Sequence, residues 1–164
     1  MGFQRFREDL CFVSPDAVNV AKKKEVFRQV ALATINTPFK YKGKTEEGLD
    51  CRGLGIYLYN KVGIDLTGLD EEYPYDFWKY PKYKDILLNA ISPHFELKEG
   101  VGTIECGNLM LFSFRSVACH LGFYIGRQEF VHSLDGVGVR KENTTTSSWS
   151  SRFLMHGKLK KGLC

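Results

Sequence analysis

The chain has 164 residues, of which 43% are apolar and 26% charged, and its formal net charge is +4 at pH 7. A chain of this length fits one domain with its own hydrophobic core, and the composition is typical of a globular protein rather than a fibrous or disordered one. The positive charge is too small and too scattered to favour nucleic-acid binding, because the lysine-rich runs at 22–24 and 158–161 are typical of solvated surface. A mildly basic surface does suit an anionic polymer.

The sequence contains no window of about 20 apolar residues, so it predicts no membrane span. Residues 1–6 lack the apolar run of a signal peptide, and we therefore expect the chain to fold in a reducing cytoplasm.

The cysteines stand at positions 11, 51, 106, 119 and 164, an odd number without paired spacing, so no disulfide framework is expected. A zinc site is the competing use for Cys106, Cys119, His120 and His132. No Cys-x-x-Cys pair is present, and the neighbours Cys119 and His120 would point to opposite faces of a strand. The sequence therefore predicts no metal, and its chemistry requires no organic cofactor.

Helical patterns dominate the first half of the chain. Residues 1–20 carry no clear period and are interpreted as an N-terminal extension, ahead of a single domain over 21–164. A helix is predicted from Ala21 to Ile35, with an apolar stripe at Val26, Phe27, Val30, Ala31 and Thr34. A second helix begins at Cys51 and ends at Gly63, with Leu54, Tyr57, Leu58 and Val62 on its buried face. A third, shorter helix is predicted over residues 83–91.

After Gly100 the pattern changes to strands. An unbroken apolar run at 109–112 predicts a strand covered on both faces, and residues 120–125 alternate before a turn at 126–128. Further strands are predicted at 130–134, 136–139 and 153–159, with a polar loop over 143–151. Helices followed by an antiparallel meander define an α+β class, with the N-terminal helices packed on the sheet.

Cys51, His120 and His132 can supply the three roles of a cysteine hydrolase. A thiol at a helix N-terminus lies where the helix dipole and free N–H groups stabilise an anion and can form an oxyanion hole. His120 can act as the base, with the small Gly122 leaving room for a substrate, and His132 on the next strand can orient it. A pair of this kind predicts a thiolate–imidazolium form near neutral pH. A buried small cysteine and two satisfied core histidines remain the alternative on spacing alone.

Ordered sequence blocks resemble the NlpC-type family of papain-like cysteine peptidases and amidases, which cut bacterial cell-wall peptides. The blocks lie at residues 37–43, 48–54, 107–112, 120–126 and 130–132, within a match from about Ala21 to Phe153. The resemblance implies a papain-like fold, with Cys51 as nucleophile, His120 as base and His132 as the third residue. It also implies that Asp50 helps to bind substrate or to set its loop.

Three positions depart from the family pattern. Arg52 replaces the usual Ser, Phe39 the usual Tyr, and Asn108 the usual Asp. Tyr41 shares a face with Phe39 in an extended segment and is a candidate for the missing hydroxyl. The fork of Arg52 suits a substrate carboxylate. We therefore predict substrate contacts from Asp50, Arg52, Phe39 and Tyr41.

Within the family, the chain is most similar to the branch found in bacteriophage tails and gene transfer agents, on residues 73–78, 93–95 and Trp149. This resemblance implies a hydrolase of the peptidoglycan stem peptide, made in the host cytoplasm and carried in a virion tail. The alternatives are a structural tail-tip or assembly protein with an idle site and a toxin amidase delivered between bacteria.

The aromatic segment 69–80 permits two interpretations. Its rings can tuck against the domain, or they can dock a tail-tip or hub protein, with acidic residues 70–72 as a polar rim. In either case the segment is expected to form one wall of the groove beside the nucleophile.

Overall fold

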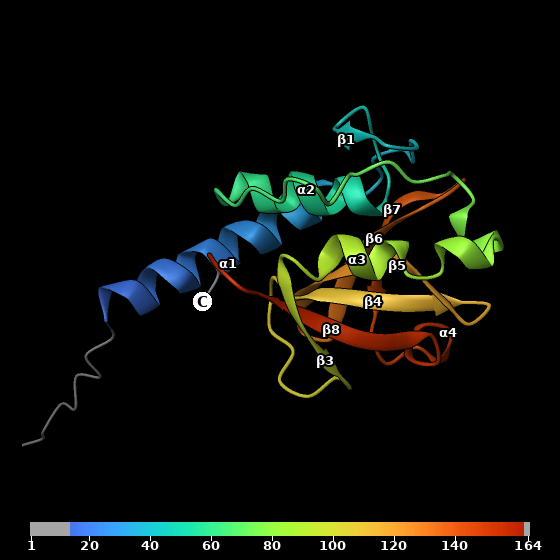
Figure 1. Cartoon of the computed structure of the whole chain (residues 1–164). Coiled ribbons are helices and arrows are strands. Elements are labelled where there is room, and N and C mark those ends of the chain that lie inside the picture. Colours follow the sequence, from blue (N-terminus) through green and yellow to red (C-terminus); the bar gives the residue numbers. More distant parts are fainter. Residues whose placement is uncertain (1–13, 163–164) are drawn as a thin grey trace, which may run out of the picture.

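The computed structural model describes residues 14–162, which adopt an α+β fold (Figure 1). The α-helices are α1 (Pro15–Ala33), α2 (Cys51–Lys61), α3 (Ile86–Ile91) and α4 (Ser147–Ser150), with 3-10 turns at Phe77–Lys79 and Pro81–Tyr83. The strands are β1 (Lys44–Thr45), β2 (Gly48–Leu49), β3 (Phe95–Glu99), β4 (Leu109–Phe114), β5 (Val117–Gly126), β6 (Glu129–Leu134), β7 (Gly138–Asn143) and β8 (Phe153–Leu159). None of the helices in this part of the chain has the length and apolar character needed to cross a bilayer.

One antiparallel sheet carries the strands from β3 onward, in the order β3-β8-β4-β5-β6-β7. Strands β4 to β7 follow one another as hairpins, which confirms the predicted meander, and β8 returns to pair with both β3 and β4. Strand β7 extends to Asn143 because its charged outer residues still pair with β6. Two elements lack a periodic pattern and are not among those predicted: β3, an edge strand of mainly charged residues, and the short α4 inside the polar loop.

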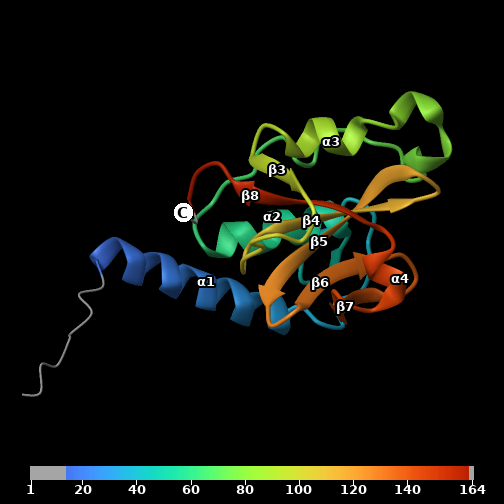
Figure 2. The same ribbon diagram turned by 90° about the horizontal axis from the view of Figure 1, so that it is seen from below.

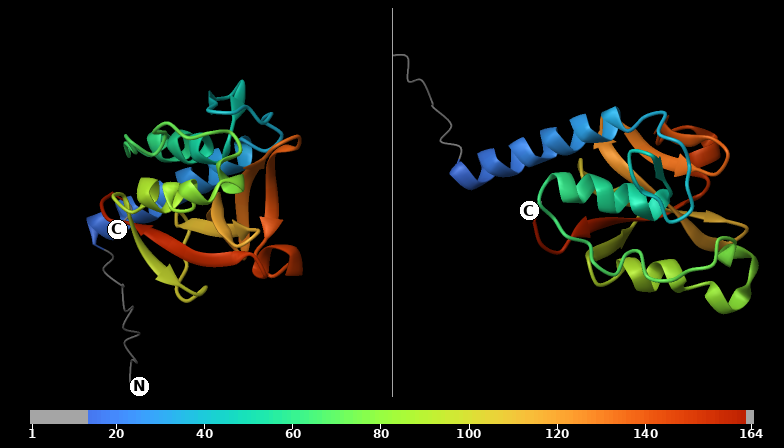
Figure 3. Two further views of the ribbon diagram at one scale, coloured as in Figure 1. Left: turned by 45° about the vertical axis from the view of Figure 1, so that its right-hand side comes forward. Right: turned by 90° about the horizontal axis from the view of Figure 1, so that it is seen from above.

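Helix α1 begins at Pro15 rather than at Ala21. The hydroxyl of Ser14 accepts a hydrogen bond from the Ala17 N–H at 3.2 Å, and proline and Asp16 occupy the first turn. The first turns are exposed and project beyond the sheet (Figures 1 and 3), so burial imposes no apolar period there. Phe27 and Ala31 are fully buried as predicted. Residues 1–13, where most of the predicted extension falls, lie outside the described part.

Helix α2 begins at Cys51, as predicted, and lies beside α1 against β5 (Figures 1 and 2). Leu54 and Leu58 are fully buried in the core. The Tyr59 hydroxyl donates to the Gly107 carbonyl oxygen at 2.6 Å, which joins the helix to the loop before β4. Buried contacts therefore hold the helix, and the cysteine at its start, in a fixed position on the sheet.

The two faces of the sheet bury different clusters. The face under the long helices carries the larger core, which includes Leu121 and Phe123 of β5. The opposite face carries a smaller cluster of Met110, Phe112, Phe130 and Trp149. Gly122 belongs to this second face, and a Cβ there would lie 2.7 Å from the Phe130 ring. The prediction that Gly122 leaves room for a substrate is therefore wrong, because aromatic side chains fill that space.

The segment between α2 and β3 folds back over the sheet. Leu69, Tyr73 and Phe77 are buried, whereas Tyr75 and Tyr80 are 45% and 48% exposed. Helix α3 spans only Ile86–Ile91, because a 3-10 turn occupies the start of the predicted helix. Tyr73, Phe77 and the partly buried Trp78 thus pack against the domain, whereas the two exposed tyrosines remain at the surface.

Candidate active site

Asp50 fixes the start of α2 and therefore the position of Cys51. One carboxylate oxygen accepts the Gly53 N–H at 2.7 Å, which caps the helix. The other accepts the Lys42 N–H at 2.8 Å and the hydroxyl of Tyr73. Asp50 is 4% exposed. Of the two roles implied for this residue, the structure shows the setting of the loop and the helix.

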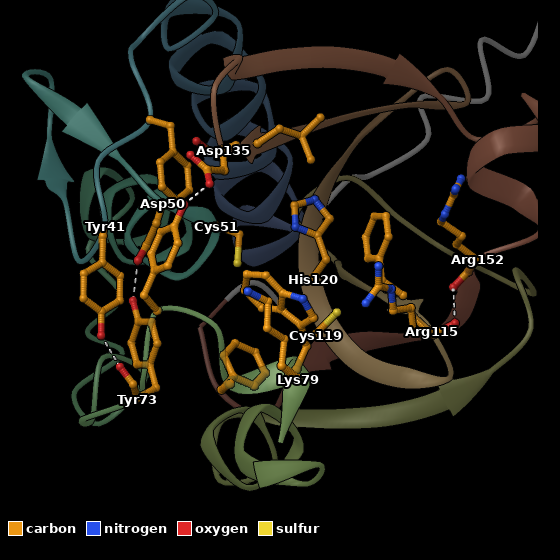
Figure 4. Close-up of a pocket in the computed structure, with 18 residues that line it drawn as sticks. Tyr41, Asp50, Cys51, Tyr73, Lys79, Arg115, Cys119, His120, Asp135 and Arg152 are labelled. Atoms are coloured by element: carbon orange, nitrogen blue, oxygen red, sulfur yellow. Dashed lines mark hydrogen bonds between the residues drawn. The ribbon is translucent and has the colours of Figure 1, made fainter. Parts of the chain in front are cut away.

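His120 faces the site because β5 contains a bulge. Phe112 lies opposite His120, and the next residue, Ser113, lies opposite Ala118, so Cys119 is the extra residue. A bulge re-aims side chains, and both Cys119 and His120 line one cavity (Figure 4). The expectation that these two neighbours point to opposite faces is therefore wrong at this position.

His132 lies directly behind His120 on the neighbouring strand. The Nε2 atom of His120 is 2.8 Å from the Nδ1 atom of His132, a hydrogen-bonding distance. His132 is fully buried, with the Trp149 ring edge-on to it at a centroid distance of 4.5 Å. This contact leaves the Nδ1 atom of His120 as the ring nitrogen that can accept a proton.

Cys51 and His120 share a cavity of about 680 Å³ (Figure 4). Its walls come from the start of α2, the β4–β5 hairpin, the end of β6 and the aromatic segment before α3. In Figure 4 the acidic residues Asp50 and Asp135 lie on one side of Cys51 and His120, and Arg115 lies on the other. The predicted groove beside the nucleophile is therefore present, and its two ends carry opposite charge.

Phe39 and Tyr41 line this cavity. The Tyr41 hydroxyl donates to the carbonyl oxygen of Tyr73, and its ring meets the Tyr73 and Tyr75 rings edge-on. The hydroxyl of Tyr75 contacts the carboxylate of Asp135 across the cavity mouth. Both predicted residues are thus placed to contact a substrate, but the Tyr41 hydroxyl is already engaged with the main chain.

Arg52 does not line the cavity, which contradicts its predicted contact with a substrate carboxylate. The side chain is 2% exposed, and its guanidinium carbon lies 3.8 Å from the centre of the Tyr73 ring. Its Nη1 atom donates to the Leu69 carbonyl oxygen at 3.4 Å. The family position that Arg52 occupies therefore serves here to hold the aromatic segment against α2.

The acidic residues of the aromatic segment pair within the chain. Asp70 forms an ion pair with Lys44, and Glu72 forms one with Lys42. These pairs connect the segment to the loop before α2, so the two together form one wall of the cavity. Two of the three acidic residues predicted as the polar rim of a docking surface therefore pair with lysines of the same domain.

Burial controls the titration of the reactive pair. It raises the pKa of the Cys51 thiol to about 12, and the Asp50 carboxylate acts in the same direction, although a hydrogen bond from the Leu121 backbone opposes both. Burial lowers the pKa of His120 well below its usual range, and that of His132 to about 4. Both shifts favour the uncharged forms and therefore act against the thiolate–imidazolium pair predicted at neutral pH.

Two kinds of site residue carry no clear signal in the sequence. Ser133 is 2% exposed and donates to the Leu49 carbonyl oxygen at 2.6 Å, which ties β6 to the residues before α2. Its place next to His132 was the only available signal. Arg115 and Asp135 lie at the tips of two different hairpins. Only the three-dimensional fold brings both side chains to the same cavity. Among residues 14–162, no group of three or more His, Cys, Asp or Glu side chains is arranged to hold a metal ion.

A cysteine at a helix start, facing a histidine pair on an antiparallel sheet, defines the class of papain-like cysteine hydrolases. A profile of the NlpC/P60 family matches residues 36–158. The chain belongs to the NlpC/P60 family.

Similar proteins share this domain. The chain is 28% identical over 126 residues to the probable peptidoglycan endopeptidase LytE of Bacillus subtilis, a match that covers 76% of the chain and 31% of LytE. The NlpC/p60 domain of the peptidoglycan hydrolase SagA superposes with a TM-score of 0.59 at 19% identity, covering 82% of the chain and 97% of that domain. An NlpC/P60 family protein from Bacillus cereus gives a TM-score of 0.62 at 16% identity, covering 86% and 40%. The chain spans less than a third of the length of the curated relatives that it matches.

Proposed function

We propose that this protein is a cysteine endopeptidase that cleaves an amide bond in the stem peptide of bacterial peptidoglycan. One observation carries the proposal: Cys51, at the capped start of α2, opens into the same cavity as His120, which is hydrogen-bonded to His132. The names of the relatives, a probable peptidoglycan endopeptidase and a peptidoglycan hydrolase among them, support peptidoglycan as the substrate.

Each step of the proposed reaction has a candidate group in the cavity. The Sγ atom of Cys51 attacks the amide carbonyl carbon while the Nδ1 atom of His120 takes the thiol proton, because burial favours the uncharged form of both groups before the attack. The Cys51 N–H, at the first helical position, has no partner within the helix and can donate to the oxyanion. His120 then protonates the leaving amine, and a water molecule activated by His120 hydrolyses the thioester.

The charge distribution of the cavity fits a stem peptide. Such a peptide presents free carboxylates, and branches or trimmed ends present amines. Asp135 suits an amine at one end of the cavity, and the exposed Arg115 suits a carboxylate at the other. Phe39 and Tyr75 between them offer apolar contact for the peptide backbone.

The first test is digestion of purified peptidoglycan sacculi. We expect release of soluble muropeptides with new amino and carboxyl ends, which mass spectrometry identifies together with the bond that is cut. Intact sacculi after prolonged incubation with folded protein would contradict the proposal, provided that sacculi from several peptidoglycan chemotypes are offered.

We further propose that the enzyme acts from a bacteriophage tail or a related particle. The resemblance to the tail-associated branch supports this, as does the pair of exposed tyrosines, Tyr75 and Tyr80, on the wall of the cavity and beside it. Aromatic residues of this kind are enriched at protein interfaces. The partner would be a tail-tip or hub protein.

A particle assay tests this second proposal. Particles assembled with Tyr80→Ser should contain less of the protein, while the purified variant digests peptidoglycan at the wild-type rate. Tyr80 is 48% exposed and does not line the cavity, so the substitution should not disturb folding or the site. Normal incorporation would remove Tyr80 from the docking surface, and absence of the wild-type protein from purified particles would refute the location.

A further inference from the structure

The far side of the histidine pair contains a buried nitrogen without a hydrogen bond. The Nε2 atom of His132 is fully buried and has no hydrogen-bond partner within the described residues. The carboxylate of Glu142 on β7 lies close to this nitrogen, with its Oε1 atom 3.8 Å away. Buried polar atoms normally have a hydrogen-bond partner, so an unpaired Nε2 atom that faces a carboxylate needs an explanation.

The strand register explains why Glu142 faces His132. Glu142 lies opposite Phe130 across the β6–β7 pair, and His132 lies opposite Arg140. Phe130 and His132 are two residues apart on β6 and share a face, so Glu142 and Arg140 share that face too. Arg140 donates to the Asn36 side chain at 3.1 Å. Glu142 is therefore the negative charge directed at the outer nitrogen of His132.

A neutral histidine pair can hold its two protons in two arrangements. In the first, His120 carries its proton on Nε2 and donates to Nδ1 of His132, so His132 carries its own proton on Nε2, toward Glu142. In the second, His132 donates from Nδ1, His120 carries its proton on Nδ1, and His120 cannot accept a proton from Cys51. Only the first arrangement gives a competent base.

We propose that Glu142 is a positioning residue that selects the first arrangement. Its carboxylate attracts a protonated Nε2 of His132 and repels the bare lone pair that the second arrangement would direct at it. Glu142 thus acts on His120 through His132 and touches neither the substrate nor the reacting atoms. The inference deepens the proposed function and rests on its assignment of His120 as the base.

Nitrogen NMR of the substrate-free protein tests the inference directly. With ¹⁵N-labelled histidine, protonated and bare ring nitrogens give well-separated signals. At pH 7.5 we expect Nε2 of both His120 and His132 to carry the protons. In Glu142→Leu, the Nδ1 signal of His120 should move toward the protonated form. A wild-type His132 protonated on Nδ1, or a Glu142→Leu spectrum with unchanged histidine signals, would overturn the inference.

Matched variants separate positioning from a general effect on the fold. Glu142→Asp keeps the carboxylate and should keep the wild-type histidine signals. Glu96→Leu removes an exposed glutamate from the edge strand β3 and should leave them unchanged. If Glu142→Leu fails to fold, Glu142→Gln takes its place, because the uncharged amide no longer repels a bare Nε2 and should raise the population of the second arrangement. A Glu142→Gln spectrum identical to wild type would then refute the inference.

Kinetics provide the second readout. We expect Glu142→Leu to lower kcat/KM for muropeptide about tenfold, the lower end of what loss of a partner behind a functional histidine costs. KM should stay unchanged and Glu142→Asp should restore most of the rate. A loss confined to KM would contradict a positioning role. Because the NMR needs no substrate, a protein that cleaves no peptidoglycan would refute the proposed function and leave the histidine result intact.

Discussion

The buried His132 should make the fold sensitive to mild acid. Its pKa is about 4 in the folded protein because burial disfavours the charged ring, whereas an unfolded histidine titrates near 6.5. As the pH falls below about 7, His132 becomes protonated in the unfolded chain but stays neutral in the folded chain. Folding stability therefore decreases with falling pH, and this loss levels off only below about pH 4.

The size of the effect follows from linkage. For pKa values of about 6.5 and 4, the free energy of unfolding falls by about 2 kcal/mol between pH 7 and pH 5 through this histidine alone. His120 is shifted in the same direction and adds to the loss. Glu129, whose pKa is lowered by the hydrogen bond with Lys141, loses its contribution at lower pH than the histidines do.

Urea unfolding of wild type and His132→Gln at pH 7 and pH 5 measures this effect. Each protein is compared with itself, so a general destabilisation of the variant cancels. We expect the variant to lose about 2 kcal/mol less than wild type over this interval. His94→Gln, a change outside the site, should retain the wild-type loss. Equal losses in wild type and His132→Gln would show that His132 does not cause the acid sensitivity.

Three further predictions concern the nucleophile, the arginine that follows it and the basic end of the cavity. Arg52→Ala should lower the free energy of unfolding by about 3 kcal/mol, because it empties a buried position under Tyr73. Faster proteolysis within the aromatic segment would report the same loss, and unchanged stability would contradict the structural role of Arg52. Alkylation of Cys51 by iodoacetamide, measured by mass spectrometry, should accelerate about tenfold per pH unit from pH 7 to 9. The reason is that the thiol pKa is about 12, so the thiolate fraction still rises about tenfold with each unit. A rate that reaches a plateau below pH 8 would contradict this. Arg115→Ala should raise KM for muropeptide about tenfold with kcat nearly unchanged, which is the typical loss for one charge-assisted hydrogen bond. The control Arg127→Ala changes the corresponding position of the next hairpin, outside the cavity, and should leave KM unchanged. Equal effects of the two substitutions would remove Arg115 from the site.

The sequence could predict the elements that periodicity marks. The start of α2 at Cys51 and the bounds of β8 follow from local pattern and composition, and both are confirmed. The start of α1 was missed although Ser14 and Pro15 form a typical helix start. An exposed helix end has no apolar face, so the spacing of apolar residues does not mark where such a helix begins.

The site was harder to predict because it depends on departures from regular geometry. The bulge that directs Cys119 and His120 into one cavity reverses the alternation expected of a regular strand. Arg52 looked available to a substrate because its position follows the nucleophile, but the stacking partner Tyr73 comes from a segment distant in sequence. The pKa of Cys51 likewise depends on burial, which results from the packing of the whole domain and not from the local sequence.

The proposed activity requires Cys51 to attack a peptide bond in peptidoglycan. Its most direct measurement compares release of new amino ends from purified sacculi by wild type, Cys51→Ala and Cys106→Ala. Cys106 is a half-buried thiol outside the cavity that donates to the Lys24 carbonyl oxygen, so it is a matched control. The account predicts release by wild type and Cys106→Ala and none above background by Cys51→Ala. Equal release by Cys51→Ala would contradict it.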